Sequence, residues 1–192
     1  MPNSNQAALA FLETRRSRPA KTLTAPVPNR EELRSLLTVA ARVPDHGKLE
    51  PWRFLVLEKP SLARLAGTLP ATGEALKIPP EKVAKEVESF ARAELAVVVV
   101  SSPKPSEKIP EIEQTLSAGA VCMQLINAAL AAGWGANWLS GWASHDADWR
   151  ERHLGLMPRE SIAGIIHLGT ESSKPPERPR PDLDAITEWI DT

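Results

Sequence analysis

One segment constrains the fold of this chain more than any other, EIEQTLSAGAVCMQLINAALAA at residues 111–132. It predicts a single long helix that ends at Gly133. A helix that is apolar on nearly every side is buried in a core or an interface. We therefore expect this helix to run through the domain centre or to form a large interface, and the small residues 118–120 favour a homodimer. The apolar positions are Ala118, Ala120, Val121, Met123, Leu125, Ile126, Ala129 and Leu130.

The same segment does not predict a membrane span. A spanning helix needs about 20 consecutive apolar residues, whereas Gln124 and Asn127 interrupt residues 118–138 and two glycines break the segment near its end. The N-terminus lacks a charged region followed by an apolar one, so we expect no secretion signal. The single Cys122 fits a reducing compartment. We expect a cytoplasmic protein without a membrane partner.

The 192 residues are enough for one well-buried domain spanning 1–192. The net charge of −1 creates no positive field, which argues against a nucleic-acid partner. Helical and strand patterns alternate along the chain, which we read as α/β. Ser4 and Asn29 are candidate helix caps, and the strand 94–102 lacks polar alternation, which predicts burial on both faces. Helices are predicted at 5–16, 29–42, 61–69, 80–93, 148–155 and 182–190, and strands at 52–58, 94–102, 135–140 and 161–170.

The sequence lacks the familiar catalytic and nucleotide-binding motifs. GWGANW at 133–138 has no third glycine and follows a helix, so it is not a dinucleotide fingerprint. Ser140 is not in a nucleophile elbow, since Trp138 stands where that motif needs glycine. No histidine is paired at a metal-binding spacing, and HDAD at 145–148 is read as a helix cap. The apolar neighbours of Cys122 predict a structural thiol, and we expect no metal site.

Two arginine-rich stretches could bind phosphate. RRSR at 15–18 ends the first helix, and ERPRP at 177–181 lies in a proline-rich tail. Guanidinium groups match phosphate oxygens in pairs, and a serine hydroxyl can complete such a site. Equally, the first stretch could complement a helix C-terminus and the second could be a solvated tail. A third stretch, ARVPDHGKLEPWRF at 41–54, carries more charge than a connector needs.

Taken in order, RRSRP, RVPDHGKLEPWRF, GWGANWLSG and HLGTESSKPPERPRP resemble the nitroreductase family of flavoproteins, and its short-chain bacterial branch in particular. The resemblance runs over nearly the whole chain. It implies an α+β sandwich whose central, mostly antiparallel sheet is flanked by helices. It also implies an intertwined homodimer that binds one FMN in each of two clefts between the chains. NAD(P)H would be the electron donor, and the chemistry would be carried by FMN, with no catalytic side chain.

The resemblance also assigns cofactor-binding residues. Arg15, Arg16 and Ser17 would hold the FMN phosphate and ribityl chain from one subunit. Arg42 and His46 would reach the same flavin from the other subunit, which accounts for the charged loop. The remaining assignments are the backbone of Trp138, Leu139 and Ser140 along the flavin, Arg178 and Arg180 at the phosphate, and Ala128–Gly133 at the nicotinamide-donor site.

The expected activity is therefore ping-pong hydride transfer from NAD(P)H through FMN to a nitroaromatic, a quinone or a similar small electron-poor acceptor. The loop departs from the commoner family pattern PS-x-x-N-x-QPW, because PDHGKLEPW stands there. The segment between strands 52–58 and 94–102 is also brief, so the cleft would be open, with Trp134, Trp138 and Trp142 as candidate lining residues. Three alternatives stay open: a flavin store or sensor without turnover, a flavin-fragmenting or dehalogenating relative, and a protein without a cofactor.

Overall fold

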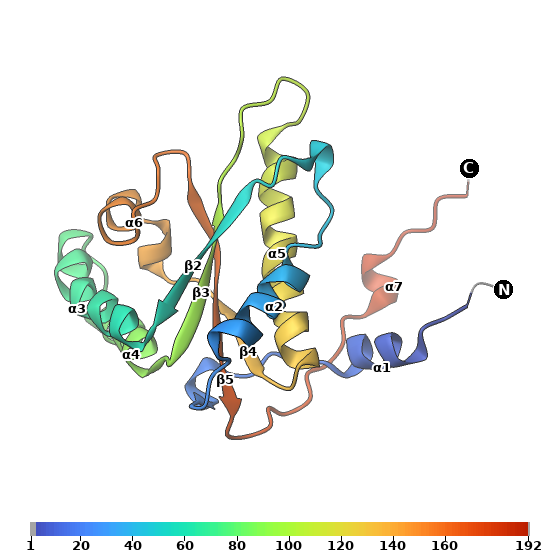
Figure 1. Ribbon diagram of the computed structural model, residues 1–192, viewed down its shortest axis with the longest axis horizontal. Helices are drawn as coiled ribbons and strands as arrows, with labels where there is room; N and C mark the ends of the chain where they lie inside the picture. The colour runs from blue at the N-terminus through green and yellow to red at the C-terminus, as the bar shows by residue number, and fades with distance from the viewer. Residues whose placement is uncertain (1–2, 192) are drawn as a thin grey trace.

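The computed structural model describes residues 3–191, which form seven α-helices around a five-stranded sheet (Figure 1). The sheet has the order β1-β5-β3-β2, and β4 is a further partner of β5. Every pairing is antiparallel. The α+β sandwich implied by the resemblance is confirmed, whereas the α/β reading, which implies parallel strands, is wrong. The strands are β1 Leu23–Thr24, β2 Trp52–Glu58, β3 Leu95–Ser101, β4 Gly135–Leu139 and β5 Ser161–Glu171.

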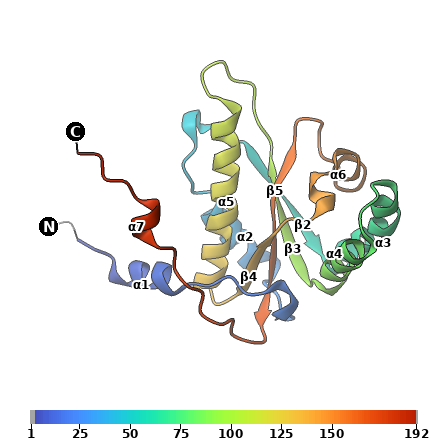
Figure 2. The same ribbon diagram turned by 180° about the vertical axis from the view of Figure 1, so that it is seen from behind.

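The helices form two layers, one on each face of the sheet. α2 and α5 cover one face, and α3, α4 and α6 cover the other (Figures 1 and 2). Short 3₁₀ turns occur at Ala20–Thr22 (η1), His46–Lys48 (η2) and Trp142–His145 (η3). The α-helices are α1 Gln6–Thr14, α2 Arg30–Ala40, α3 Lys59–Ala75, α4 Pro80–Arg92, α5 Glu111–Ala131, α6 Ala147–Leu154 and α7 Leu183–Ile186.

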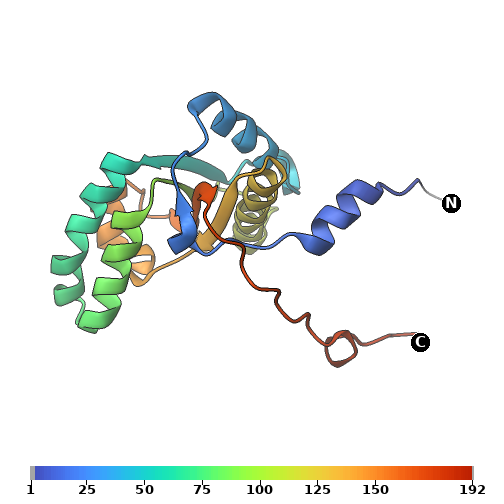
Figure 3. The same ribbon diagram turned by 90° about the horizontal axis from the view of Figure 1, so that it is seen from below.

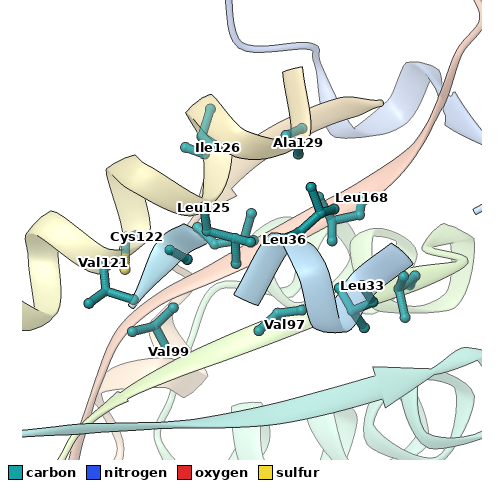
Figure 4. Close-up of a cluster of buried hydrophobic side chains, with 14 residues drawn as sticks. Leu33, Leu36, Val97, Val99, Val121, Cys122, Leu125, Ile126, Ala129 and Leu168 are labelled. Carbon is teal, nitrogen blue, oxygen red and sulfur yellow. The ribbon is translucent and has the colours of Figure 1, made fainter. Parts of the chain in front are cut away.

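The central strand β3 divides the core into two halves. All seven of its residues are buried. Val97 and Val99 pack with Leu125 on the side of α2 and α5 (Figure 4). Val98 and Val100 belong to the cluster under α3, α4 and α6. The missing polar alternation therefore predicted burial correctly, but it could not predict strand direction, because two helical layers bury an antiparallel sheet as completely as a parallel one.

Some helix ends differ from the sequence prediction. The cap of α1 is Asn5 and not Ser4, because the Asn5 side chain accepts a hydrogen bond from the Ala8 amide at 3.1 Å. Asn29 caps α2 in a complete capping box, as predicted. The predicted helix at 61–69 extends through Pro70, since its buried face continues beyond the proline. The closing helix α7 is a single turn of four residues, shorter than predicted.

Much apolar surface stays uncovered in one chain. One side of α5 packs on the sheet, while Ile112, Leu116 and Met123 on its other side are exposed. α1 has no buried residue. It and the C-terminal tail extend away from the body in the same direction (Figure 3). Within residues 3–191, no helix combines the length and apolar character needed to cross a bilayer. The exposed large apolar residues of the tail are Leu183, Ile186, Trp189 and Ile190.

Candidate functional site

The segment after α1 brings three arginines to the sheet. α1 ends at Thr14, where the Arg15 amide donates to the carbonyl of Phe11. The chain then runs beside β4: the Arg18 amide donates to the Ala136 carbonyl at 2.8 Å. Asn137 Nδ2 returns a hydrogen bond to the Arg18 carbonyl at 2.6 Å. These contacts hold the RRSR stretch against the β4–β5 end of the sheet.

Arg18 is part of this cluster, although the family resemblance assigns only its neighbours to the cofactor. Its Nε donates to Glu171 Oε2 at 2.7 Å. Its Nη1 donates to the Arg16 carbonyl at 2.8 Å. Arg18 therefore ties the cluster to the end of β5. The RRSR motif contained this residue, but only the fold reveals its carboxylate partner 153 positions away.

The cluster is strongly positive and incompletely paired. Burial lowers the pKa of the Arg15 guanidinium, and the charges of Arg16, Arg18 and Arg180 lower it further. Arg15 Nε and Arg16 Nε are both buried without a hydrogen-bond partner among the described residues. Arg15 Nη2 donates to Ser17 Oγ at 3.3 Å, so the serine hydroxyl lies within the cluster. An anion at this point would relieve the mutual repulsion and satisfy the unpaired N–H groups.

A cavity of about 240 Å³ opens beside these arginines. It lies between the end of α1, the end of α5 and the end of β5. The wall of this cavity includes residues beside the arginines that belong to the predicted nicotinamide-donor segment, Leu130 and Gly133. Trp134, which follows that segment directly, also lines the cavity. The predicted donor segment therefore adjoins the predicted phosphate site. The full lining is Phe11, Thr14, Arg15, Arg16, Arg18, Leu130, Gly133, Trp134 and Glu171.

The proline-rich tail joins the cluster through one of its two arginines. Arg180 donates to the Glu13 carbonyl at the end of α1. Arg16 Nη2 donates to the Pro176 carbonyl at 3.0 Å. Glu177 lies between the two guanidinium groups, 4.0 Å from Arg16 and 3.6 Å from Arg180. Arg178 is exposed and makes no hydrogen bond or ion pair within residues 3–191.

The charged loop after α2 forms a second group. Gly47, Lys48 and Glu50 have φ angles of +74°, +53° and +47°, a left-handed conformation that is strained for the two non-glycine residues. The Asp45 carboxylate offsets this strain by accepting hydrogen bonds from the Leu49 and Glu50 amides at 3.2 and 2.9 Å. Asp45 therefore has a structural role within the loop.

The loop is anchored to the first turns of α5. Ser117 Oγ donates to the Pro44 carbonyl at 2.6 Å. His46 Nδ1 lies 2.7 Å from Glu113 Oε2. His46 and Arg42 are both exposed. The loop thus places His46 at the start of α5, whereas the arginine cluster lies at its end.

The two groups are far apart within one chain. Glu113 touches the loop, and Leu130 lines the arginine cavity. These positions are separated by 17 residues of helix, which at about 1.5 Å per residue is ~25 Å. One chain therefore brings together Arg15, Arg16, Ser17 and Arg180, but it does not bring Arg42 or His46 to them.

The end of β4 holds the last predicted site residues. Trp138 is 38 % exposed and lies over Gly164 of β5, where an added Cβ would come within 3.0 Å of the indole ring. Because Gly164 has no side chain, the indole ring of Trp138 can pack directly against its backbone. Leu139 is half-buried, and Ser140 is exposed just beyond the strand. The chain is therefore accessible to solvent at Ser140, directly after β4.

Other candidates have structural roles. Cys122 is buried in the core, and burial raises the pKa of its thiol to about 12, as expected for a structural cysteine. Asp146 caps α6 by accepting a hydrogen bond from the Trp149 amide at 2.7 Å, which confirms the reading of HDAD as a cap. Between residues 3 and 191, no three His, Cys, Asp or Glu side chains gather as metal ligands would.

Comparison with known proteins agrees with these features. A model of the Nitroreductase family matches residues 12–170. A Haemophilus influenzae protein provisionally named an NAD(P)H nitroreductase is 37 % identical over 168 residues, 87 % of this chain and 90 % of the relative. YdjA of Escherichia coli K12, with the same provisional name, is 34 % identical over 167 residues, again 87 % and 90 % of the two chains.

Solved structures show the same fold. A nitroreductase-like protein of Bacillus cereus superposes with a TM-score of 0.79 at 23 % identity, covering 99 % of this chain and 98 % of the other. A Desulfovibrio desulfuricans protein provisionally named a nitroreductase, solved in complex with FMN, gives a TM-score of 0.74 at 22 % identity, with 99 % of each chain covered.

Proposed function

This chain belongs to the nitroreductase family, and from that membership we propose that it is an FMN-dependent NAD(P)H oxidoreductase. Bound FMN would accept hydride from NAD(P)H and pass electrons to a nitroaromatic, a quinone or a similar electron-poor acceptor. The protein would bind and orient that cofactor and adjust its reduction potential.

The observation that carries the proposal is the incompletely paired arginine cluster. The buried Nε atoms of Arg15 and Arg16 lack partners within the described chain. Arg180 and Ser17 add a further guanidinium and a hydroxyl. A phosphate group supplies oxygens in the arrangement that such forks bind. The residues present therefore fit the phosphate end of FMN.

Completion of this site requires a second copy of the chain. His46 contacts Glu113, which lies ~25 Å along α5 from Leu130 in the cavity wall, farther than one FMN molecule extends. If two α5 helices pack antiparallel through their exposed apolar faces, the start of one helix lies beside the end of the other. The loop of one subunit then meets the arginine cluster of its partner. The exposed Ile112, Leu116 and Met123 would be buried in that homodimer.

Each group has a defined task in the assembled site. Arg15, Arg16 and Arg180 would neutralise the phosphate, while Arg42 and His46 of the partner would contact the flavin. The backbone from Trp138 to Ser140 would lie along the ring. Donor groups aimed at charge that develops on reduction stabilise the reduced state. The acceptor would enter from the exposed side.

The test is the absorbance spectrum of the purified protein before and after anaerobic NADH or NADPH. A flavin spectrum that bleaches supports the oxidoreductase. Arg16→Ala should bind FMN at least tenfold more weakly, while Arg30→Ala, whose side chain is exposed on α2, should bind like the wild type. A colourless wild-type protein that ignores added FMN would overturn the proposal. Bound flavin that neither nicotinamide reduces would favour storage or sensing.

A further inference from the structure

A buried carboxyl group lies beneath the turn that follows β4. Glu86, on α4, is only 8 % exposed. The Trp142 amide donates to Glu86 Oε2 at 3.1 Å. The Ala143 amide is a second backbone donor to the same carboxyl group. Glu86 Oε1 is buried and has no hydrogen-bond partner within the described chain. The hydrogen-bond donors to Glu86 are therefore backbone amides of the turn, and not side chains of the helices α3, α4 and α6.

Gly141 and Glu86 fit each other closely. A Cβ added to Gly141 would come within 3.0 Å of three atoms of the Glu86 carboxyl group. Any other residue at 141 would therefore push the carboxyl group or the turn out of place. Gly141 directly follows Ser140, which is the last residue assigned to the flavin edge. The carboxyl group thus supports the backbone from behind at the point where the flavin would contact it.

The carboxyl group is held by backbone donors and not by a countercharge. Burial raises the pKa of Glu86, and the N–H groups of Ala143 and Trp142 oppose that rise. Hydrogen bonds from N–H groups favour the ionised form. The turn also contains the buried Trp142 Nε1, which has no hydrogen-bond partner among residues 3–191. Burial therefore makes a negative charge next to the β4–η3 turn costly, while the two N–H groups favour it.

We propose that Glu86 is a positioning residue for the flavin: its carboxylate holds the Ser140–Trp142 turn in place, and its negative charge lowers the flavin reduction potential. The inference rests on the FMN site proposed above. The reduced flavin carries negative charge, so a nearby carboxylate disfavours it relative to the oxidised form. An acceptor that takes electrons from the reduced flavin would then be reduced more readily.

Three variants separate the two roles. Glu86→Gln keeps the size and an acceptor oxygen but removes the charge. Glu86→Ala removes both. Glu88→Gln is the matched control, because Glu88 lies on the same helix but is exposed and pairs with Arg92. Two readouts are needed: hydrogen exchange of the amides from Gly141 to Ala143 in the flavin-free protein, and affinity for oxidised and for reduced FMN.

The expected results differ for each variant. Glu86→Gln should keep amide exchange within about threefold of wild type and shift the ratio of affinities about tenfold toward reduced FMN, which is about 30 mV for a two-electron couple. Glu86→Ala should exchange the Trp142 amide at least tenfold faster, because that donor loses its acceptor. Glu88→Gln should match wild type in both. If Glu86→Ala fails to fold, the affinity ratio of Glu86→Gln decides alone.

The failures can be told apart. A wild-type protein that binds no flavin overturns the proposed function, and the role of Glu86 falls with it. A wild-type protein that binds flavin, together with a Glu86→Gln variant of unchanged affinity ratio, overturns only the inference on Glu86.

Discussion

The ion pair between Arg53 and Glu160 should be a main determinant of acid stability. Glu160, in the loop before β5, is 7 % exposed, and Arg53 at the start of β2 binds it through two hydrogen bonds of 2.7 and 2.6 Å. The Met157 amide donates a third at 2.9 Å. The pair joins segments 107 residues apart. We therefore expect Glu160→Gln to destabilise the protein at neutral pH.

The magnitude follows from the ionisation of Glu160. The hydrogen bond from Arg53 is the largest cause that lowers its pKa, from 4.5 to about 2. At ~1.36 kcal/mol per pKa unit this corresponds to at most about 3.4 kcal/mol. The Arg53 side chain is 36 % exposed, so solvent screening reduces the figure. We expect Glu160→Gln to lower the free energy of unfolding by about 2 kcal/mol at pH 7.

The pH dependence has a definite sign. A carboxyl group whose pKa is lowered on folding stabilises the protein above the unfolded-state pKa, and this stabilisation is lost as pH falls through the folded value. The difference between wild type and Glu160→Gln should therefore be largest above pH ~5 and shrink toward pH ~2. Burial also lowers the pKa of His167 to about 4, so both proteins lose stability progressively as the pH falls from ~6.5 to ~4. Because this loss is the same in wild type and in Glu160→Gln, it cancels in the difference.

Urea unfolding at one fixed protein concentration measures this difference from pH 7 to the lowest pH at which both proteins remain folded. Glu88→Gln is the control, since exposed i,i+4 pairs such as Arg92–Glu88 contribute only ~0.3–0.5 kcal/mol. The reasoning is refuted if Glu160→Gln costs no more than this control at pH 7. It is equally refuted if the cost stays constant as the pH falls below 4.

Three further predictions concern other parts of the molecule. Glu177→Gln should tighten FMN binding by up to about fivefold in fluorescence titration, because the exposed carboxylate no longer competes with the phosphate for Arg16 and Arg180 and exposed ion pairs contribute ~0–1 kcal/mol. Unchanged or weaker binding would contradict this. Leu125→Ala should lower the free energy of unfolding by ~2–5 kcal/mol, since this side chain is fully buried, whereas Leu9→Ala on exposed α1 should have little effect. Leu116→Glu, at a position 66 % exposed on α5, should shift the protein toward monomer in sedimentation equilibrium, while Leu76→Glu at the end of α3 should not; a monomeric wild type would refute the proposed dimer.

Local sequence patterns were sufficient for most individual elements. β3 and the strands predicted at 52–58 and 161–170 lie within one residue of their expected bounds. The capping box of Asn29 and the long helix ended by Gly133 were also predicted. These features depend on hydrogen bonds and side chains a few residues apart, which the sequence displays directly. The resemblance to a known family supplied the sheet direction, which the patterns alone misread.

For the candidate site, the sequence revealed the unusual segments but not how their residues meet. The sequence identified RRSR and the charged loop as unusual, because guanidinium groups and the density of charge are read directly from neighbouring residues. It did not show that Arg18 pairs with Glu171, that Arg180 but not Arg178 reaches the cluster, or that the Glu86 carboxyl group packs against Gly141. It also did not show that the loop and the cluster lie at opposite ends of α5. Each of these facts depends on contacts between residues far apart in the chain, and only the packing of helices on the sheet determines which of those residues meet.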